Sequence, residues 1–153
     1  MQRYLCKLPD FLAGMCSQEQ FNTWLMRKTR SILRRDRKRG NTCGTYREYK
    51  LAIYRAVVDS SGNCAYTGKL LRWDLISMYD NKMAKLGGRK YQRMLYEVPT
   101  IDHVSDGLGV PDFRICSWVV NSCKNQLGLQ EFLMLCRQIL EFHGEKVSSS
   151  KQK

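Results

Sequence analysis

A long amphipathic helix that ends in a cluster of bases is the sequence feature that most constrains the fold. Ser17 and Gln20 have the spacing of a capping box, which starts a helix. Apolar residues then recur at helical spacing and define one face: Phe21, Trp24, Leu25, Ile32 and Leu33. Gly40 suits the position just beyond a cationic last turn. We therefore expect a helix over residues 17–39.

The polar part of this helix is strongly basic. The chain of 153 residues carries 26 Lys and Arg against 14 Asp and Glu, a formal net charge of +12. Eight of the bases lie in residues 27–39 and are opposed there only by Asp36: Arg27, Lys28, Arg30, Arg34, Arg35, Arg37, Lys38 and Arg39. A solvated face usually mixes signs, so this one predicts contact with phosphates. An anionic membrane surface is the second candidate partner, but Trp24 and Leu25 are better used as core anchors.

Composition and cysteine usage narrow the class of protein. A hydrophobic content of 43% can build a core, and no apolar run reaches the length of a membrane span. The N-terminal residues lack the apolar stretch of a signal peptide. Seven cysteines form no C-x-x-C pair, which predicts thiols that are mostly buried, a reducing cytoplasm and no structural zinc. We expect a cytoplasmic protein.

The remaining elements predict an α+β fold that is mostly helical. Thr45 and Glu48 form a second capping box ahead of a helix over 46–58, and further helices are expected over 73–86, 118–125 and 129–142. Two short strands are expected over 98–104 and 112–116, joined by a loop. The predicted regions are a basic helical N-terminal region (1–60), a second region with the strands and the C-terminal helix (61–144) and a disordered tail (145–153).

The order strand, loop, strand, helix carries a spaced set of polar residues. Asp102-His103 ends the first strand, Asp112 follows nine residues after His103, and Asn121-x-x-Lys124 begins nine residues after Asp112. This pattern resembles the HNH branch of the ββα-metal (His-Me finger) endonucleases, and its spacing is similar to that of the HNH domain in RNA-guided CRISPR effector nucleases. The segment from Cys64 to Gly68 looks like a degenerate C-x-x-C-G knuckle. The resemblance spans residues 62–127.

The resemblance implies a small ββα-metal motif that hydrolyses phosphodiester bonds. His103 would be the general base, since imidazole is suited to deprotonating water near neutral pH. Asp102 and Asn121 would be the ligands of a divalent metal, Mg²⁺ or Mn²⁺. Asp112 stands where the family commonly has an Asn that orients the histidine, so it is the second predicted catalytic residue.

The same resemblance favours DNA over RNA as the substrate. Arg114 and Lys124 join the eight bases of residues 27–39 as predicted nucleic-acid contacts, and a homodimer would supply two active sites for a double-strand cut. Two other functions stay open at this point. One is a nucleic-acid-binding protein that uses an HNH-like scaffold without catalysis. The other is an interaction protein that mimics or blocks another nucleic-acid-binding factor.

Overall fold

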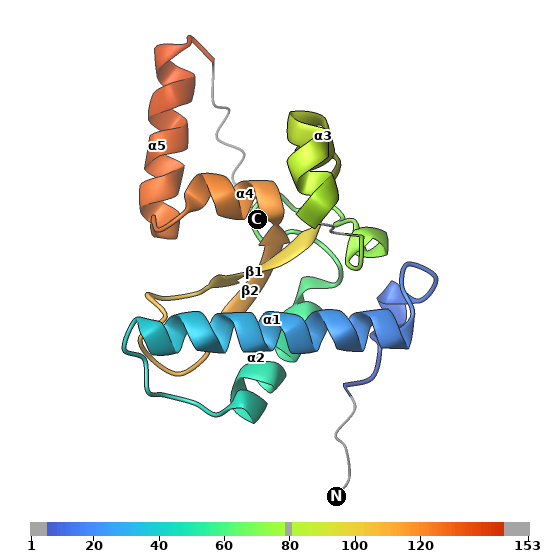
Figure 1. The fold of residues 1–153 in the computed structure, drawn as a ribbon. Helices are drawn as coiled ribbons and strands as arrows, with labels where there is room; N and C mark the ends of the chain where they lie inside the picture. Colours follow the sequence, from blue (N-terminus) through green and yellow to red (C-terminus); the bar gives the residue numbers. More distant parts are fainter. Residues whose placement is uncertain (1–5, 79–80, 146–153) are drawn as a thin grey trace, which may run out of the picture. The chain divides into compact units, whose positions relative to one another are not determined.

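The computed structural model describes residues 6–78 and 81–145. Over these residues the fold is α+β and mostly helical, with a two-stranded antiparallel sheet, as predicted (Figure 1). The chain divides into two compact units, Met1–Ser122 and Cys123–Lys153. The predicted tail from 146 onward lies outside the described residues. None of the described helices is both long enough and apolar enough to cross a bilayer.

Both predicted capping boxes are confirmed. The helix α1 spans Gln18–Lys38, and Ser17 Oγ accepts a hydrogen bond from the Gln20 N–H at 3.1 Å. The helix α2 spans Tyr46–Ser60, and the Glu48 carboxylate accepts from the Thr45 N–H at 2.6 Å. The Glu48 pKa is lowered by this hydrogen bond. These local contacts fix where each helix begins, because they satisfy N–H groups that the helix itself leaves unpaired.

The first unit has one hydrophobic core, built mainly from α1 and α2. The apolar face of α1 is buried as predicted at Phe21, Trp24 and Leu25. Trp24 meets Trp73 edge to face, with ring centroids 5.3 Å apart. The indole N–H of Trp73 donates to the Gly62 carbonyl at 3.0 Å, so a turn after α2 is tied into the same core.

The two strands form a hairpin. Strand β1 spans Pro99–His103 and pairs antiparallel with β2, Phe113–Ser117, so that Pro99 lies opposite Ser117 and His103 opposite Phe113. The hairpin is joined to the segment after α2, because the Ala65 N–H donates to the Ile115 carbonyl at 2.9 Å. Helix α4, Trp118–Lys124, follows β2 directly. Both strands and α4 are therefore confirmed within one or two residues of their predicted ends.

The prediction for residues 73–86 is wrong. Trp73–Leu75 is only a short 3₁₀ helix, and α3 spans Asn81–Met94. The buried Trp73 ring anchors its segment to the core, which replaces the expected helix start with a tight turn. Gly88 takes φ 51°, ψ −141°, so the glycine pair breaks α3 internally instead of closing a helix.

In the second unit, α5 spans Leu129–Phe142 as predicted, with Gly128 at its N-cap. None of its side chains is buried, although its apolar residues fall on one face.

Four of the seven cysteines are buried, namely Cys6, Cys16, Cys64 and Cys116, and all seven are free thiols.

Candidate active site

His103 ends β1 and lies against the first turn of the hairpin loop. Its ring meets Phe113, its cross-strand neighbour, edge to face at 5.2 Å. The backbone of Gly107 covers the other side so closely that a Cβ there would lie 3.0 Å from the ring Cδ2. Gly107 also has φ +76°, a conformation that other residues adopt only with strain. The loop can close over the imidazole because this position is glycine.

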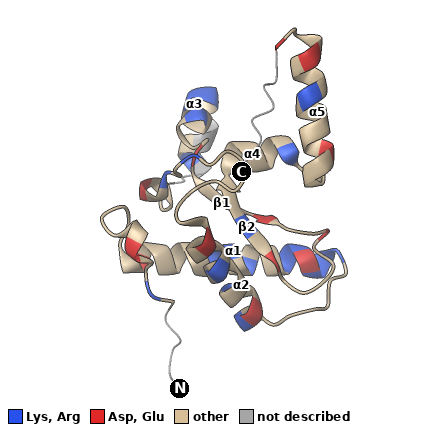
Figure 2. Cartoon of the chain, turned by 180° about the vertical axis from the view of Figure 1, so that it is seen from behind, with Lys and Arg blue, Asp and Glu red and all other residues tan. Residues whose placement is uncertain are grey.

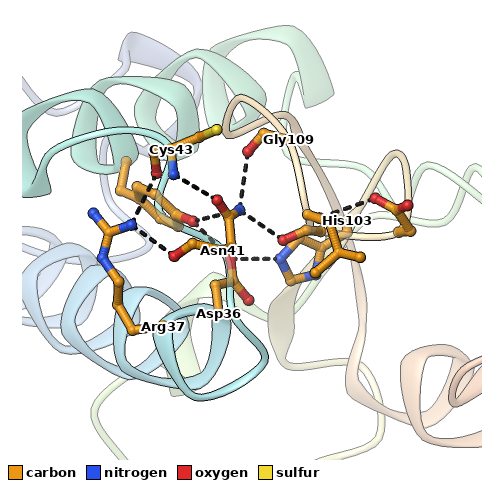
Figure 3. Close-up of polar contacts among 10 residues, drawn as sticks. Asp36, Arg37, Asn41, Cys43, His103 and Gly109 are labelled. Carbon is orange, nitrogen blue, oxygen red and sulfur yellow. Dashed lines mark hydrogen bonds and ion pairs between the residues drawn. The ribbon is translucent and has the colours of Figure 1, made fainter.

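The hydrogen-bond partner of His103 comes from α1, 67 residues earlier in the chain. His103 Nε2 lies 3.0 Å from Asp36 Oδ2, with 17% of the imidazole side chain exposed and only 2% of the Asp36 side chain (Figure 3). A carboxylate only accepts hydrogen bonds, which assigns a proton to Nε2, and in the neutral form of the ring the lone pair is then on Nδ1. The pair is therefore a buried carboxylate that orients a half-buried imidazole.

Tyr49 completes the surroundings of the carboxylate. Its hydroxyl donates to the same Asp36 Oδ2 at 2.9 Å. Burial, this hydrogen bond and the charge of Asp36 together raise the pKa of Tyr49 to about 12, so the phenol stays protonated as a donor. Asp36 Oδ1 is buried and has no hydrogen-bond partner among the described residues. A buried acceptor without a partner is rare and leaves room for one more donor or for water.

Asn41 joins the end of α1 to the hairpin loop. Its side-chain amide donates to the Gly107 carbonyl at 2.7 Å and to the Gly109 carbonyl at 2.9 Å, and its oxygen accepts from the Cys43 N–H (Figure 3). Its own backbone N–H donates to the Asp36 carbonyl at 3.0 Å. The same short segment thus holds both the carboxylate and the loop that covers His103.

The predicted metal ligand Asp102 precedes His103 and is buried. Its Oδ2 accepts a short hydrogen bond from the Tyr66 hydroxyl. Burial and this hydrogen bond raise the pKa of Tyr66, which keeps it a donor. Arg114 lies opposite Asp102 in the sheet, and its guanidinium carbon sits 5.6 Å from the centre of the Tyr66 ring. The Arg114 Nε is buried without a hydrogen-bond partner among the described residues, while the side chain as a whole is partly exposed, and its contact with phosphate stays a prediction.

The other predicted site residues occupy different positions around the hairpin. The Asp112 side chain is exposed, while its carbonyl accepts from the Val104 N–H at 3.1 Å. Asn121 lies partly exposed on α4, and Lys124 ends that helix as a buried residue. The residue that the structure hydrogen-bonds to His103 is Asp36. Asp36 is therefore a second candidate, besides Asp112, for the residue that orients the His103 ring.

The predicted metal site is tested by the chemistry of its donors. Asp102 offers a carboxylate and Asn121 an amide oxygen, both hard donors of the kind that Mg²⁺ and Mn²⁺ prefer. Over residues 6–78 and 81–145, no three His, Cys, Asp or Glu side chains gather into a cluster. Mg²⁺ is usually held by only one or two carboxylates, with water and substrate completing its shell. The donor set therefore fits a metal of this kind, and ligation by Asp102 and Asn121 stays a prediction.

The bases of α1 fall into two groups. Three have contacts inside the protein. Arg27 donates to the Ile76 carbonyl at 3.0 Å, Lys28 donates to Thr100 Oγ1 at 3.1 Å, and Arg37 donates to the carbonyls of the loop after α1, including Asn41 at 2.7 Å. The other five are exposed and lie between residue 30 and the C-cap of α1: Arg30, Arg34, Arg35, Lys38 and Arg39. Figure 2 shows the Lys and Arg positions along the α1 ribbon in blue. We call these five residues the basic face.

A groove runs along the same helix. It has a volume of about 450 Å³ and is lined by residues of α1 alone, among them Arg27, Arg30 and Arg34. Cations around a hollow attract a polyanion more strongly than cations on a convex surface. The basic face and this groove form an exposed, cationic part of the predicted nucleic-acid surface.

The sequence reasoning missed Asp36, Asn41, Tyr49 and Tyr66. Asp36 was counted as the one acid opposing the basic run, although a signal for its burial was available. Residues 25, 29, 32 and 36 share one helical face, and the structure buries all four. An acid on the apolar side of a helix needs a buried partner, so its position already pointed to a polar cluster in the core.

Comparison with models of known protein families, with curated proteins and with solved structures found no match. Any inference about the class of the protein therefore depends on the spaced polar residues of the hairpin and on the geometry around His103.

Proposed function

We propose that this protein is a metal-dependent endonuclease of the HNH type that hydrolyses phosphodiester bonds. The observation that carries the proposal is the hydrogen bond between His103 and the buried Asp36. It holds the imidazole in one tautomer, with the lone pair of Nδ1 free to take a proton from water. A fixed base beside a basic surface is the arrangement that hydrolysis of a polyanion requires.

In this proposal each residue of the site has its own chemical role. His103 accepts the proton of the attacking water, and Asp36 stabilises the imidazolium that forms. Asp102 and Asn121 would hold Mg²⁺ or Mn²⁺, and Asp112 remains a second catalytic candidate. When bound, the metal would neutralise charge on the phosphate and on the leaving oxygen. Arg114 and Lys124, in addition to the basic face, stay predicted phosphate contacts.

The proposed substrate is nucleic acid, with DNA favoured over RNA by the HNH resemblance. The five exposed bases would contact the phosphate backbone and make binding salt-dependent. Contacts to phosphates position a strand without reading its sequence. We therefore expect cleavage with little sequence preference.

Cleavage of supercoiled plasmid with Mg²⁺ or Mn²⁺ tests the proposal. His103→Ala should abolish nicking, and excess chelator should do the same to the parent protein. The matched control is His143→Ala, because His143 is the C-cap of α5 and belongs to the other unit. Nicking that survives His103→Ala, or that fails equally in both variants, would contradict the proposed base.

The second candidate is a nucleic-acid-binding protein without catalysis. One observation favours it: His103 is packed between Phe113 and Gly107 and bonded to a buried acid, which is also how a structural imidazole is held. Tight, salt-sensitive DNA binding by a parent protein that never cleaves would support this candidate. In that case His103→Ala would lower the free energy of unfolding, and neither the variant nor the parent would cleave DNA.

A further inference from the structure

A second cavity lies at the other end of β1 from His103. It has a volume of about 520 Å³ and is enclosed by α1, by the segment around Leu75 and Ile76, by α3 and by residues 95–100. Thr100, at its edge, and His103 are three residues apart along the strand, roughly 10 Å. All of its lining residues belong to the first unit. The cavity is therefore separate from the proposed catalytic residues.

Lys28 supplies the positive charge of this cavity. The side chain is half-buried, and its ammonium donates to Thr100 Oγ1 at 3.1 Å, which leaves two N–H donors on the nitrogen for other groups. Arg27 also lines the cavity and is fixed by its bond to the Ile76 carbonyl. None of the described lining residues is an acid. Desolvation and the neighbouring cations Arg27 and Arg35 lower the pKa of Lys28 to about 8.

The rest of the lining is aromatic and apolar. Trp24, Tyr91 and Trp118 all border the cavity, together with Leu95 and other apolar residues. The indole Nε1 of Trp24 is buried and has no hydrogen-bond partner among the described residues. Flat aromatic side chains favour planar rings, and every nucleobase offers such a face. Among the described lining residues, the cavity thus combines a cation and no acid with walls suited to a planar group.

We propose that this cavity binds a single nucleotide, with its phosphate at Lys28 and Thr100 and its base against the aromatic walls. The volume falls within the range of cavities that hold small ligands. A nucleotide also satisfies both halves of the lining, whereas inorganic phosphate uses only Lys28 and an uncharged ring uses only the aromatic part. The proposal goes beyond hydrolysis, because it requires neither His103 nor a metal.

Isothermal titration of the full chain with adenosine 5′-monophosphate tests this binding, with adenosine and inorganic phosphate as separate probes. We expect saturable binding of the nucleotide and at least about tenfold weaker binding of either probe alone. Phosphate that binds as tightly as the nucleotide would overturn the proposed base contact. Adenosine that binds as tightly would overturn the proposed phosphate contact, and absence of saturable nucleotide binding would overturn the proposal as a whole.

The Lys28→Met variant distinguishes nucleotide binding in the cavity from non-specific attraction of the nucleotide to positive charge. Methionine keeps the length of the side chain and removes the ammonium, and we expect the nucleotide to bind about tenfold more weakly. Arg55→Gln is the matched control, because it removes one charge at an exposed residue that lies outside both this cavity and the basic face, and it should change affinity less than twofold. Equal losses in the two variants would contradict a defined site.

Three further measurements keep the result independent of folding and of catalysis. Near-ultraviolet circular dichroism reports whether Lys28→Met keeps its tertiary packing, and the pH dependence of binding by the parent protein needs no variant. His103→Ala should bind the nucleotide like the parent. If the nuclease proposal fails and this binding persists, only the proposed reaction is wrong. Loss of nucleotide binding in a folded His103→Ala protein would contradict a separate cavity.

Discussion

At the scale of single residues, Asp36 has the largest consequences in the fold. It is the one acid among the eight bases of residues 27–39, yet it is buried and bonded to both His103 and Tyr49. The Asp36 carboxylate therefore orients an imidazole in the core and does not pair with the exposed bases of the basic face. Local sequence could indicate that Asp36 is buried, but not that its partner lies 67 residues away, since no periodic pattern encodes a contact at that distance.

Asp36→Ala should strongly destabilise the protein. The change leaves the Tyr49 hydroxyl and the His103 ring without their buried acceptor, and losing the acceptor of such donors costs about 1–3 kcal/mol for each group. We expect the free energy of unfolding in urea to fall by roughly 3 kcal/mol. Asp59→Ala, at an exposed acid of α2, should change it by less than about 0.5 kcal/mol. Equal unfolding curves for Asp36→Ala and the parent would contradict the buried pair.

Gly107 and Gly68 have similar positive φ angles, so an alanine would suffer similar backbone strain at either position. Gly107→Ala and Gly68→Ala both place a Cβ at positive φ, +76° and +68°. Only the Cβ at Gly107 would meet the His103 ring, whereas that at Gly68 would meet nothing within 4 Å. Gly68→Ala should cost about 1 kcal/mol, and Gly107→Ala at least about 1 kcal/mol more. Thermal unfolding compares the two, and equal shifts in the melting temperature would show that the loop does not pack on the imidazole.

The protonation of Lys28 sets a pH dependence for nucleotide binding. Its pKa of about 8 means that the ammonium is present at pH 7 and lost above pH 9. Among the described residues, the other titratable or charged groups around it are Arg27 and Arg35 on α1, Cys116 on β2 and Tyr91 at the cavity wall. The nucleotide phosphate is already fully ionised above pH 7. Affinity should therefore fall about tenfold or more from pH 7.5 to 9.5 in the parent and stay flat in Lys28→Met. A parallel fall in both proteins would assign the effect to another group.

At the scale of elements, α1 combines a core face with a basic face. Its start, its apolar face and its end could all be predicted, because capping boxes and helical spacing are local signals. The division of its bases could not, since Arg27, Lys28 and Arg37 are engaged by residues far away or by the following loop. The failure at residues 73–86 has the same cause: the burial of Trp73 in the core overrides a weak helical pattern.

Neutralising part of the basic face should weaken DNA binding and flatten its salt dependence. In Arg34→Gln/Arg35→Gln/Lys38→Gln, the slope of log K against log salt should decrease in magnitude by about 2 to 3, roughly one for each lost phosphate contact. The control neutralises three exposed bases of other segments, Arg55, Lys69 and Arg137, with the same change in net charge. Fluorescence anisotropy over a series of salt concentrations measures the slope for each of the two triple variants. Equal slopes for the two triple variants would place the phosphates elsewhere.

At the scale of the whole molecule, the order of elements from 98 to 142 could be read from the sequence almost entirely. The hairpin, α4 and α5 each lie within one or two residues of their predicted bounds. The α+β class followed from the same patterns. What the sequence did not contain was the packing of the hairpin against the basic N-terminal region. That packing turns an isolated Asp-His pair into an imidazole held by Asp36 and covered by a loop that Asn41 fastens.

The most direct test of the central claim is chemical rescue of the missing imidazole. Single-turnover cleavage of a labelled DNA duplex is measured with Mg²⁺ for the parent, His103→Ala and His143→Ala, with and without added imidazole. We predict a loss of about 10² to 10⁴-fold in His103→Ala, partial recovery with imidazole, and no change in His143→Ala. A His103→Ala protein that is folded and cleaves at the parent rate would contradict the claim that His103 is the general base.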